Sequence, residues 1–167
     1  IENRLSVFPV SLSDEYRLAI GLLRSSMTAD ELEQWAAQGL AMAEQGARAW
    51  EVALEYFQAS PSIIHNYRTA TLLEWGELGN TMSQESPLVA AAYLRASVSI
   101  SGVASHEIIL WGKLGQSFYG GTWKSTSLAC KFFEITPALL HWLTYPELER
   151  FAGFIGALSS RSNDLAQ

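Results

Sequence analysis

Leu32-Glu33-Gln34-Trp35-Ala36-Ala37-Gln38-Gly39-Leu40-Ala41-Met42 decides the fold of this chain, because its spacing of large and small residues recurs three more times. The later copies are Leu72-x-x-Trp75-x-x-x-Gly79-x-x-Met82, Ile108-x-x-Trp111-x-x-x-Gly115-x-x-Phe118 and, without the glycine, Leu148-x-x-Phe151-x-x-x-Ile155-x-x-Leu158. In every copy a large apolar residue stands three residues before the central ring and seven residues after it. These offsets bring side chains back to one face of an α-helix. Each copy therefore predicts a helix.

A second element follows each of the first three copies at nearly constant distance. It contains an aromatic residue and ends at a hydroxyl residue, which is followed by proline in two of the three cases. The three versions are Tyr56-Phe57-Gln58-Ala59-Ser60-Pro61, Tyr93-Leu94-Arg95-Ala96-Ser97-Val98 and Phe132-Phe133-Glu134-Ile135-Thr136-Pro137. Paired elements that recur with a period of 36 to 40 residues are typical of stacked helical repeats.

The predicted fold is therefore all-α, a right-handed α-solenoid of helical hairpins of the HEAT- or TPR-like kind. Three full repeats are expected at residues 28–65, 66–103 and 104–142, with a partial repeat at 146–158. They form a repeat domain over 14–158, between an extended lead-in at 1–13 and a polar tail at 159–167. Proline disfavours a helical residue before it, so Pro61 and Pro137 are expected to end or interrupt the aromatic helices.

The recurring positions are interpreted as structural. A glycine inside a helix costs about 1 kcal/mol relative to alanine, so we expect a partner helix or a neighbouring aromatic ring to approach each motif glycine closely. The positions assigned to the repeat structure are Leu32, Trp35, Gly39, Leu72, Trp75, Gly79, Ile108, Trp111, Gly115, Tyr56, Tyr93 and Phe132.

Composition narrows the class of protein. The chain has 167 residues, 49% of them hydrophobic, and a formal net charge of −6. This charge argues against a nucleic-acid partner, which favours clustered Lys and Arg. A single cysteine, Cys130, excludes an internal disulfide, and no apolar run reaches the roughly 20 residues of a membrane span. Because the chain starts at Ile1 and the partner of the fourth motif helix would fall beyond Gln167, we expect a segment of a larger protein.

Motifs for catalysis, metals or cofactors do not emerge. His106-Glu107 resembles half of a zinc-protease motif, but Leu110 stands where the second histidine is needed. The loop at 120–125 lacks the glycine before its lysine that a phosphate-binding loop requires. We therefore predict no catalytic residue, no metal site and no cofactor, and the protein is not expected to be an enzyme.

Three tryptophans have no counterpart in the other copies: Trp50, Trp123 and Trp142. Because the repeat does not require them, and because tryptophan is a common anchor at interfaces, they are the candidate partner-binding residues. The alternative is that they fill local gaps between helices.

Leu-x-x-Trp-x-x-x-Gly followed by Ala-x-x-Tyr-Phe-x-x-Ser-Pro resembles the N-terminal helical repeats of NorD-like and CoxE-like von Willebrand factor A proteins, the nitric-oxide-reductase activation type. The resemblance covers residues 28–158. It implies a cytoplasmic adaptor that works with a MoxR-type AAA+ ATPase in activating a metalloenzyme. The family's von Willebrand domain and its Asp-x-Ser-x-Ser metal site are absent from this sequence, so no functional residue carries over.

The sequence thus predicts a non-catalytic protein-interaction or scaffold module. One alternative is a helical enzyme or ligand-binding domain with a pocket between helices, which convergence of acids with His65, His106 or His141 would favour. Another is a structural spacer, or an oligomerisation domain that self-associates through open repeat ends.

Overall fold

The computed structural model describes residues 2–46, 48–100 and 103–164, and every regular element in these ranges is an α-helix. This confirms the all-α prediction. The helices are α1 (Glu2–Leu5), α2 (Val10–Leu23), α3 (Ala29–Ala43), α4 (Trp50–Asn66), α5 (Thr69–Glu85), α6 (Pro87–Ser97), α7 (Ser105–Gln116), α8 (Trp123–Leu139) and α9 (Tyr145–Asp164).

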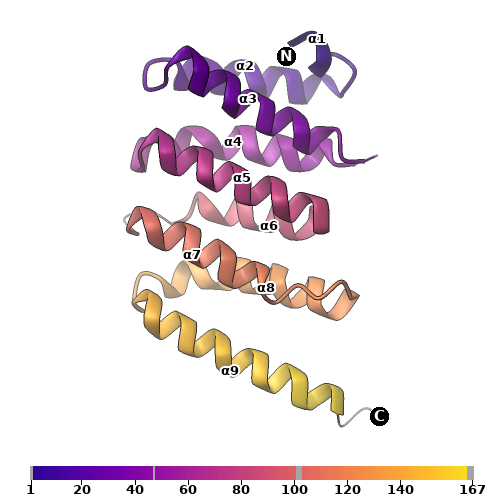
Figure 1. Ribbon diagram of the computed structural model, residues 1–167, viewed down its shortest axis with the longest axis vertical. Coiled ribbons are helices and arrows are strands. Elements are labelled where there is room, and N and C mark those ends of the chain that lie inside the picture. Colours follow the sequence, from indigo (N-terminus) through magenta and orange to yellow (C-terminus); the bar gives the residue numbers. More distant parts are fainter. Residues whose placement is uncertain (1, 47, 101–102, 165–167) are drawn as a thin grey trace.

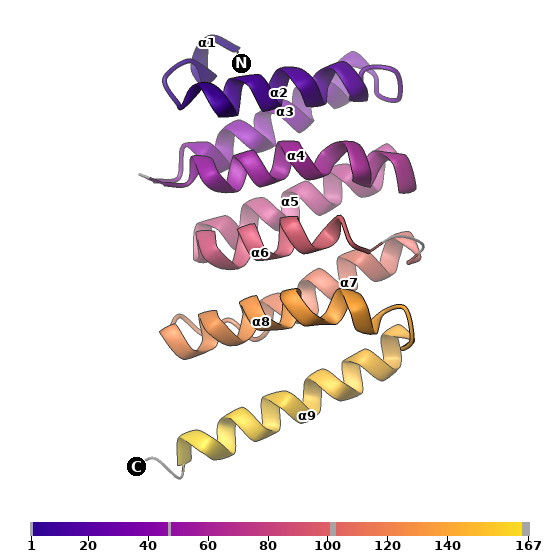
Figure 2. The ribbon, with the colours of Figure 1, turned by 180° about the vertical axis from the view of Figure 1, so that it is seen from behind.

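From α2 onward the helices form two layers. One layer contains α3, α5, α7 and α9, which lie in front in Figure 1. The other contains α2, α4, α6 and α8, which lie in front in the reverse view of Figure 2. Within a layer each helix packs beside the next, and each of α3, α5 and α7 also packs on the helix that follows it. Helix α9 packs on α7 but diverges from α8 toward its C-terminal end (Figures 1 and 2).

Local sequence sets several helix starts. Thr28 forms a capping box with Glu31, whose carboxylate accepts the Thr28 backbone N–H at 2.7 Å. Ser86 caps α6, with Pro87 in the first turn, where its missing N–H costs nothing. Before α8 the chain turns at Gly121, which has a φ of 73°.

One contact occurs three times between the layers. The indole N–H of a fully buried motif tryptophan donates to a buried hydroxyl on the following helix. The pairs are Trp35 with Ser60 at 2.9 Å, Trp75 with Ser97 at 2.9 Å and Trp111 with Thr136 at 2.7 Å. A buried indole N–H without a partner is costly, so these hydroxyls stabilise the burial of the rings.

The same tryptophans belong to a continuous column of rings through the middle of the stack. Neighbouring centroids lie between 5.0 and 6.3 Å apart, within the range of favourable aromatic pairs. The order along the column is Tyr16, Trp35, Tyr56, Trp75, Tyr93, Trp111 and Phe133. Tyr56 and Tyr93 each contact the tryptophans of two successive helix pairs, so each of these tyrosines stabilises both its own helix pair and the packing of the next pair on it.

The close approach expected at the motif glycines is made by side chains of the following helix. A Cβ atom on Gly39 would lie 2.4 Å from the ring of Phe57, and one on Gly115 would lie 2.2 Å from the ring of Phe133. At Gly79 the nearest atom belongs to Leu94, at 2.8 Å. Any larger residue would force these rings or side chains away.

The prediction that Pro61 and Pro137 end or interrupt the aromatic helices is wrong. Pro61 lies inside α4, and Pro137 lies inside α8, which runs without a break. The residue before each proline is helical, and its hydroxyl makes two hydrogen bonds. The Ser60 hydroxyl accepts the Trp35 N–H and donates to the Tyr56 carbonyl at 2.6 Å, and the hydroxyl of Thr136 donates to the Phe132 carbonyl at the same distance.

The predicted extended lead-in at 1–13 is also wrong within the described residues. Helix α1 covers Glu2–Leu5, and α2 begins at Val10 with Pro9 as its N-cap. Leu5 and Leu12 are completely buried, so core packing orders this segment. At the other end the expected polar tail is helical through Asp164, and 165–167 lie outside the described residues.

Candidate functional site

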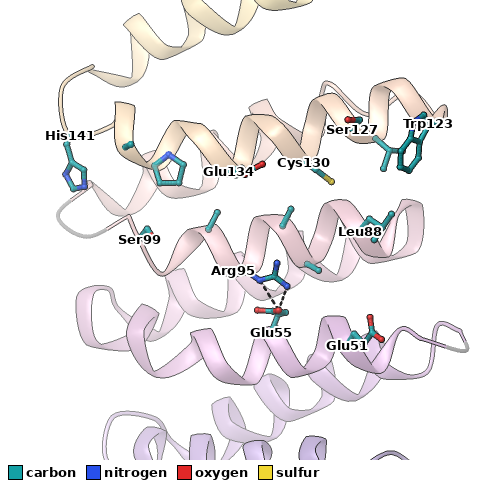
Figure 3. Close-up of a pocket in the computed structure, with 16 residues that line it drawn as sticks. Glu51, Glu55, Leu88, Arg95, Ser99, Trp123, Ser127, Cys130, Glu134 and His141 are labelled. Atoms are coloured by element: carbon teal, nitrogen blue, oxygen red, sulfur yellow. Dashed lines mark hydrogen bonds and ion pairs between the residues drawn. The ribbon is translucent and has the colours of Figure 1, made fainter.

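A groove crosses the layer formed by α4, α6 and α8, and Figure 3 shows its lining. Its volume is about 850 Å³. We call it the α4–α6–α8 groove. It follows α8 from Trp123 to the end of the helix and reaches His141 in the turn beyond it. The 17 residues of α8, at a rise of 1.5 Å per residue, correspond to roughly 25 Å.

Small side chains on α6 make the floor of this groove. Ala91, Ala92 and Ala96 line it and are half-buried. Helix α8 also contributes small groups, among them Ser127, Cys130 and Ala138, so short side chains on both helices line the trough. The groove thus results from small side chains on neighbouring helices of one layer.

Exposed apolar side chains gather at one end of the groove. Trp123, on the first turn of α8, is 77% exposed, and Leu88, on the first turn of α6, is 61% exposed. Both stand at the same end in Figure 3, near Glu51 of α4. Covering an exposed tryptophan or leucine removes apolar surface from water, which lowers the free energy. This end of the groove is therefore suited to anchoring a partner.

An ion pair between Arg95 of α6 and Glu55 of α4 lies along the α4 side of the groove. The Arg95 guanidinium donates to a single carboxylate oxygen of Glu55 through two nitrogens, Nε at 3.0 Å and the adjacent Nη2. The hydrogen bond to Glu55 raises the pKa of Arg95. The Glu55 side chain is 20% exposed and that of Arg95 is 69% exposed. The pair therefore joins α4 to α6 and leaves the guanidinium open to solvent.

Cys130 lines the groove as a neutral thiol. Burial raises its pKa, and the charge of Glu134 acts in the same direction. A thiol with a raised pKa is a weak nucleophile near neutral pH, because the thiolate is the reactive form. In this state Cys130 contributes an apolar surface to the groove.

The structure separates the three candidate tryptophans. Trp123 lines the groove, whereas Trp142 lies in the turn after α8 and is 87% exposed outside it. Trp50 is half-buried at the start of α4 and packs against the hydrophobic core. Only Trp123 is thus a groove residue, and the packing of Trp50 matches the gap-filling alternative.

The three histidines are spread over the molecule. His65, His106 and His141 are all exposed, and His141 alone lines the groove, at the end opposite Trp123. In the part of the chain that the structure describes, no three His, Cys, Asp or Glu side chains lie close enough together to hold a metal ion.

Sequence reasoning missed the floor and the ion pair of the groove. Two signals for them are present. Alanines cluster on α6, and Glu55 and Arg95 are opposite charges 40 residues apart, about one period. Residues separated by one period lie side by side in adjacent helices of a layer.

Within the described ranges, none of the helices has the length and apolar character that crossing a bilayer requires. Comparison with protein-family models, with curated proteins and with solved structures finds no significant match to this chain.

Proposed function

We propose that the chain is a non-catalytic protein-interaction module of the right-handed α-solenoid type, and that its binding site is the α4–α6–α8 groove. The observation that carries this proposal is the open groove with the exposed Trp123 and Leu88 at one end. Stacked helices offer extended surfaces that bind partners by shape.

The shape of the groove favours a helical partner. A trough of roughly 25 Å accommodates about four to five turns of helix. The three groove-lining acids are each paired with a basic side chain, Glu51 with Arg48, Glu55 with Arg95 and Glu134 with Lys131. The proposed ligand is therefore an amphipathic helix that binds through its apolar stripe, which covers the α6 alanines.

The resemblance to NorD-like and CoxE-like proteins suggests where such a helix comes from. On that basis we propose a cytoplasmic adaptor whose partner is a MoxR-type AAA+ ATPase, acting in metalloenzyme activation. The resemblance rests on the residue pattern alone, and the groove proposal does not depend on it.

The test is an affinity pull-down from source extract with three variants beside the parent. Ala92→Trp fills the floor of the groove, and Trp123→Ala removes the anchor. Trp142→Ala is the matched control, because it deletes an exposed tryptophan outside the groove. Circular dichroism checks that each variant is folded.

We expect a partner that the parent and Trp142→Ala retain and that both groove variants lose. Mass spectrometry of the retained protein then tests the AAA+ assignment. If Ala92→Trp still binds the partner, or if Trp142→Ala loses it to the same extent as the groove variants do, the groove is not the binding site.

A small-ligand site is the second candidate. The volume of about 850 Å³ lies within the range of ligand pockets, and the lining contains a thiol, an imidazole and a guanidinium. Thermal-shift screening of the parent and of Ala92→Trp with the same compounds tests this function. A compound that raises the melting temperature of the parent but not of the variant would support it.

A further inference from the structure

Polar side chains link successive helices of the layer that contains α2, α4, α6 and α8. In each case the residue before the aromatic ring on one helix meets the residue two positions after the ring on the next helix. Gln58 of α4 donates to Glu15 of α2 at 3.5 Å, and Arg95 of α6 donates to Glu55 of α4 through Nε at 3.0 Å. The repeat thus places one side-chain link at each of these two helix boundaries.

The boundary between α6 and α8 lacks this link. The two equivalent positions hold Ala92 and Glu134. Alanine has no polar side-chain atom, and Glu134 forms an ion pair with Lys131 of its own helix. In the described part of the chain, α6 and α8 are therefore held together by apolar contacts such as that between the rings of Tyr93 and Phe133, whose centroids lie 5.4 Å apart.

A second link, in the core, joins the α3–α4 pair to the α5–α6 pair. Three residues after the motif tryptophan, Gln38 of α3 accepts the Tyr56 hydroxyl at 2.9 Å. The same side-chain amide donates to the Leu73 carbonyl of α5 at 3.0 Å. One glutamine thus joins α3, α4 and α5, and it satisfies the buried tyrosine hydroxyl.

Leu78 replaces this glutamine at the next boundary, between the α5–α6 pair and the α7–α8 pair. A Cβ atom on Gly76 of α5 would lie 2.8 Å from the Tyr56 ring, at the first boundary. In the same way, a Cβ atom on Gly112 of α7 would lie 2.6 Å from the Tyr93 ring, so the two tyrosines occupy equivalent places. The Tyr93 hydroxyl, however, is buried without a hydrogen-bond partner among the described residues. An unpaired buried hydroxyl lowers stability, so this boundary loses a link and carries a penalty as well.

Among the described residues, the polar contacts that remain at this boundary lie on the surface. Gln116, at the end of α7, donates to the Glu85 carboxylate at 3.0 Å, and the Tyr119 hydroxyl donates to the Glu85 carbonyl at 2.8 Å. Exposed contacts contribute little, because water competes for both partners. The stability of stacked repeats is approximately a sum of repeat terms and nearest-neighbour interface terms, so a stack opens first at its weakest interface.

The α4–α6–α8 groove lies over this boundary. Ala92 is part of its floor, and Glu134 lines its α8 side. Leu88 stands on α6 and Trp123 stands on α8 (Figure 3), so the two anchor residues of the groove lie on opposite sides of the boundary.

We propose that the boundary between the α5–α6 pair and the α7–α8 pair is the joint at which the stack opens, and that a bridge across the groove from α6 to α8 holds this joint closed. Opening separates Trp123 on α8 from Leu88 on α6. A partner that contacts both residues therefore binds the closed form better and shifts the population toward it. This consequence rests on the proposed function of the groove, whereas the joint itself is a property of the chain alone.

Native-state hydrogen exchange of the whole chain, read by mass spectrometry, tests the joint. In the parent, the amides inside α7 and α8 should exchange about tenfold faster than those inside α4 and α5, because a buried hydrogen-bond link is missing at their boundary. Leu78→Gln supplies an amide beside the Tyr93 hydroxyl and should slow exchange in α7 and α8 about tenfold.

Two further variants control this comparison. Leu78→Met keeps an apolar side chain of similar size and should not slow exchange, and fraying from the chain end would be the same in both Leu78 variants. Gln38→Leu makes the first boundary resemble the second, so it should speed exchange in α3 and α4 about tenfold without speeding it in α8. Circular dichroism checks that each variant is folded.

Rebuilding the layer link across the groove tests the second part of the proposal. Ala92→Glu combined with Glu134→Arg places between α6 and α8 the pair that Glu55 and Arg95 form between α4 and α6. Exchange in α7 and α8 should slow about two- to fivefold in this double variant. Ala92→Glu alone is the control, because it puts two carboxylates opposite each other and should not slow exchange.

Equal protection of α4, α5, α7 and α8 in the parent, or exchange in Leu78→Gln no slower than in Leu78→Met, would overturn the joint. A double variant that exchanges no more slowly than Ala92→Glu would overturn the bridge. These measurements need no partner, so their failure is distinct from failure of the proposed function, which is a pull-down in which the groove variants retain the partner.

Discussion

Trp35 and Phe151 occupy the same position of the recurring motif, yet their surroundings differ. Trp35 is completely buried, lies between Tyr16 and Tyr56 and donates its N–H to Ser60. Phe151 is 37% exposed and has no described helix over it. The comparison teaches that the motif specifies a face, while the neighbouring helix decides whether that face becomes core.

The largest expected effect comes from removing the central ring in each setting. Trp75→Ala should lower the free energy of unfolding by about 3–5 kcal/mol, because it opens a cavity in the ring column. Phe151→Ala should cost about 1 kcal/mol or less, because the ring is partly in water. Urea denaturation followed by circular dichroism measures both. Equal losses would mean that α9 is as well covered as α5.

The second-largest effect is expected from removing a hydroxyl that accepts an indole N–H. Thr136→Val keeps the side-chain shape but leaves the Trp111 N–H without its acceptor in the core. The expected loss is about 1–3 kcal/mol.

Thr81→Val is the control for this substitution. Thr81 also donates to the carbonyl four residues before it, at 3.0 Å, but it is exposed on α5. Its loss should stay within about 0.5 kcal/mol. Similar losses in the two threonine variants would show that the indole contact adds nothing to stability.

A methyl group tests the close approach at the motif glycines. Gly115→Ala should cost about 1–2 kcal/mol, because contact with Phe133 and Phe132 outweighs the gain in helix propensity. Gly153→Ala, on the open side of α9, should instead stabilise by up to about 1 kcal/mol, since no atom lies within 4 Å. Thermal denaturation measures the change in stability of both variants. Changes of opposite sign would support the contrast between α7 and α9, and changes of the same sign would contradict it.

The smallest effect concerns two tyrosine hydroxyls in the column. The Tyr56 hydroxyl donates to Gln38 at 2.9 Å, whereas that of Tyr93 is buried with no hydrogen-bond partner among the described residues. Tyr56→Phe should therefore cost about 0.5–1.5 kcal/mol, and Tyr93→Phe should be neutral or slightly stabilising.

These tyrosines also predict an alkaline limit to stability. Burial raises the pKa of both above the ordinary value of about 10, so the unfolded chain releases their protons first. Their stabilising contribution is complete below that pH and is lost as the pH rises through it. Tyr93→Phe should lose less stability than the parent in alkaline titration. An identical alkaline loss would mean that Tyr93 does not titrate on unfolding.

Much of the candidate site was beyond sequence reasoning, and the reason is specific. The periodicity marked Trp123 as lying outside the repeat but could not separate it from Trp142, because a place in the groove depends on the helix that lies alongside. The groove arises where small residues of α6 and α8 lie beside each other, a relation between helices 30 to 40 residues apart. Prolines and helix caps act within a few residues, so they carry no information about how helices so far apart in the sequence pack together.

The sequence by itself determined the helical class, the identity of the buried rings and several helix starts, because helical spacing and caps act within a few residues. Tertiary structure decided that Pro61 and Pro137 lie inside helices, since the packing of α4 and α8 in the stack outweighs the local preference before a proline. It also decided which motif faces are covered. Burial requires a second surface, and that surface belongs to a helix elsewhere in the chain.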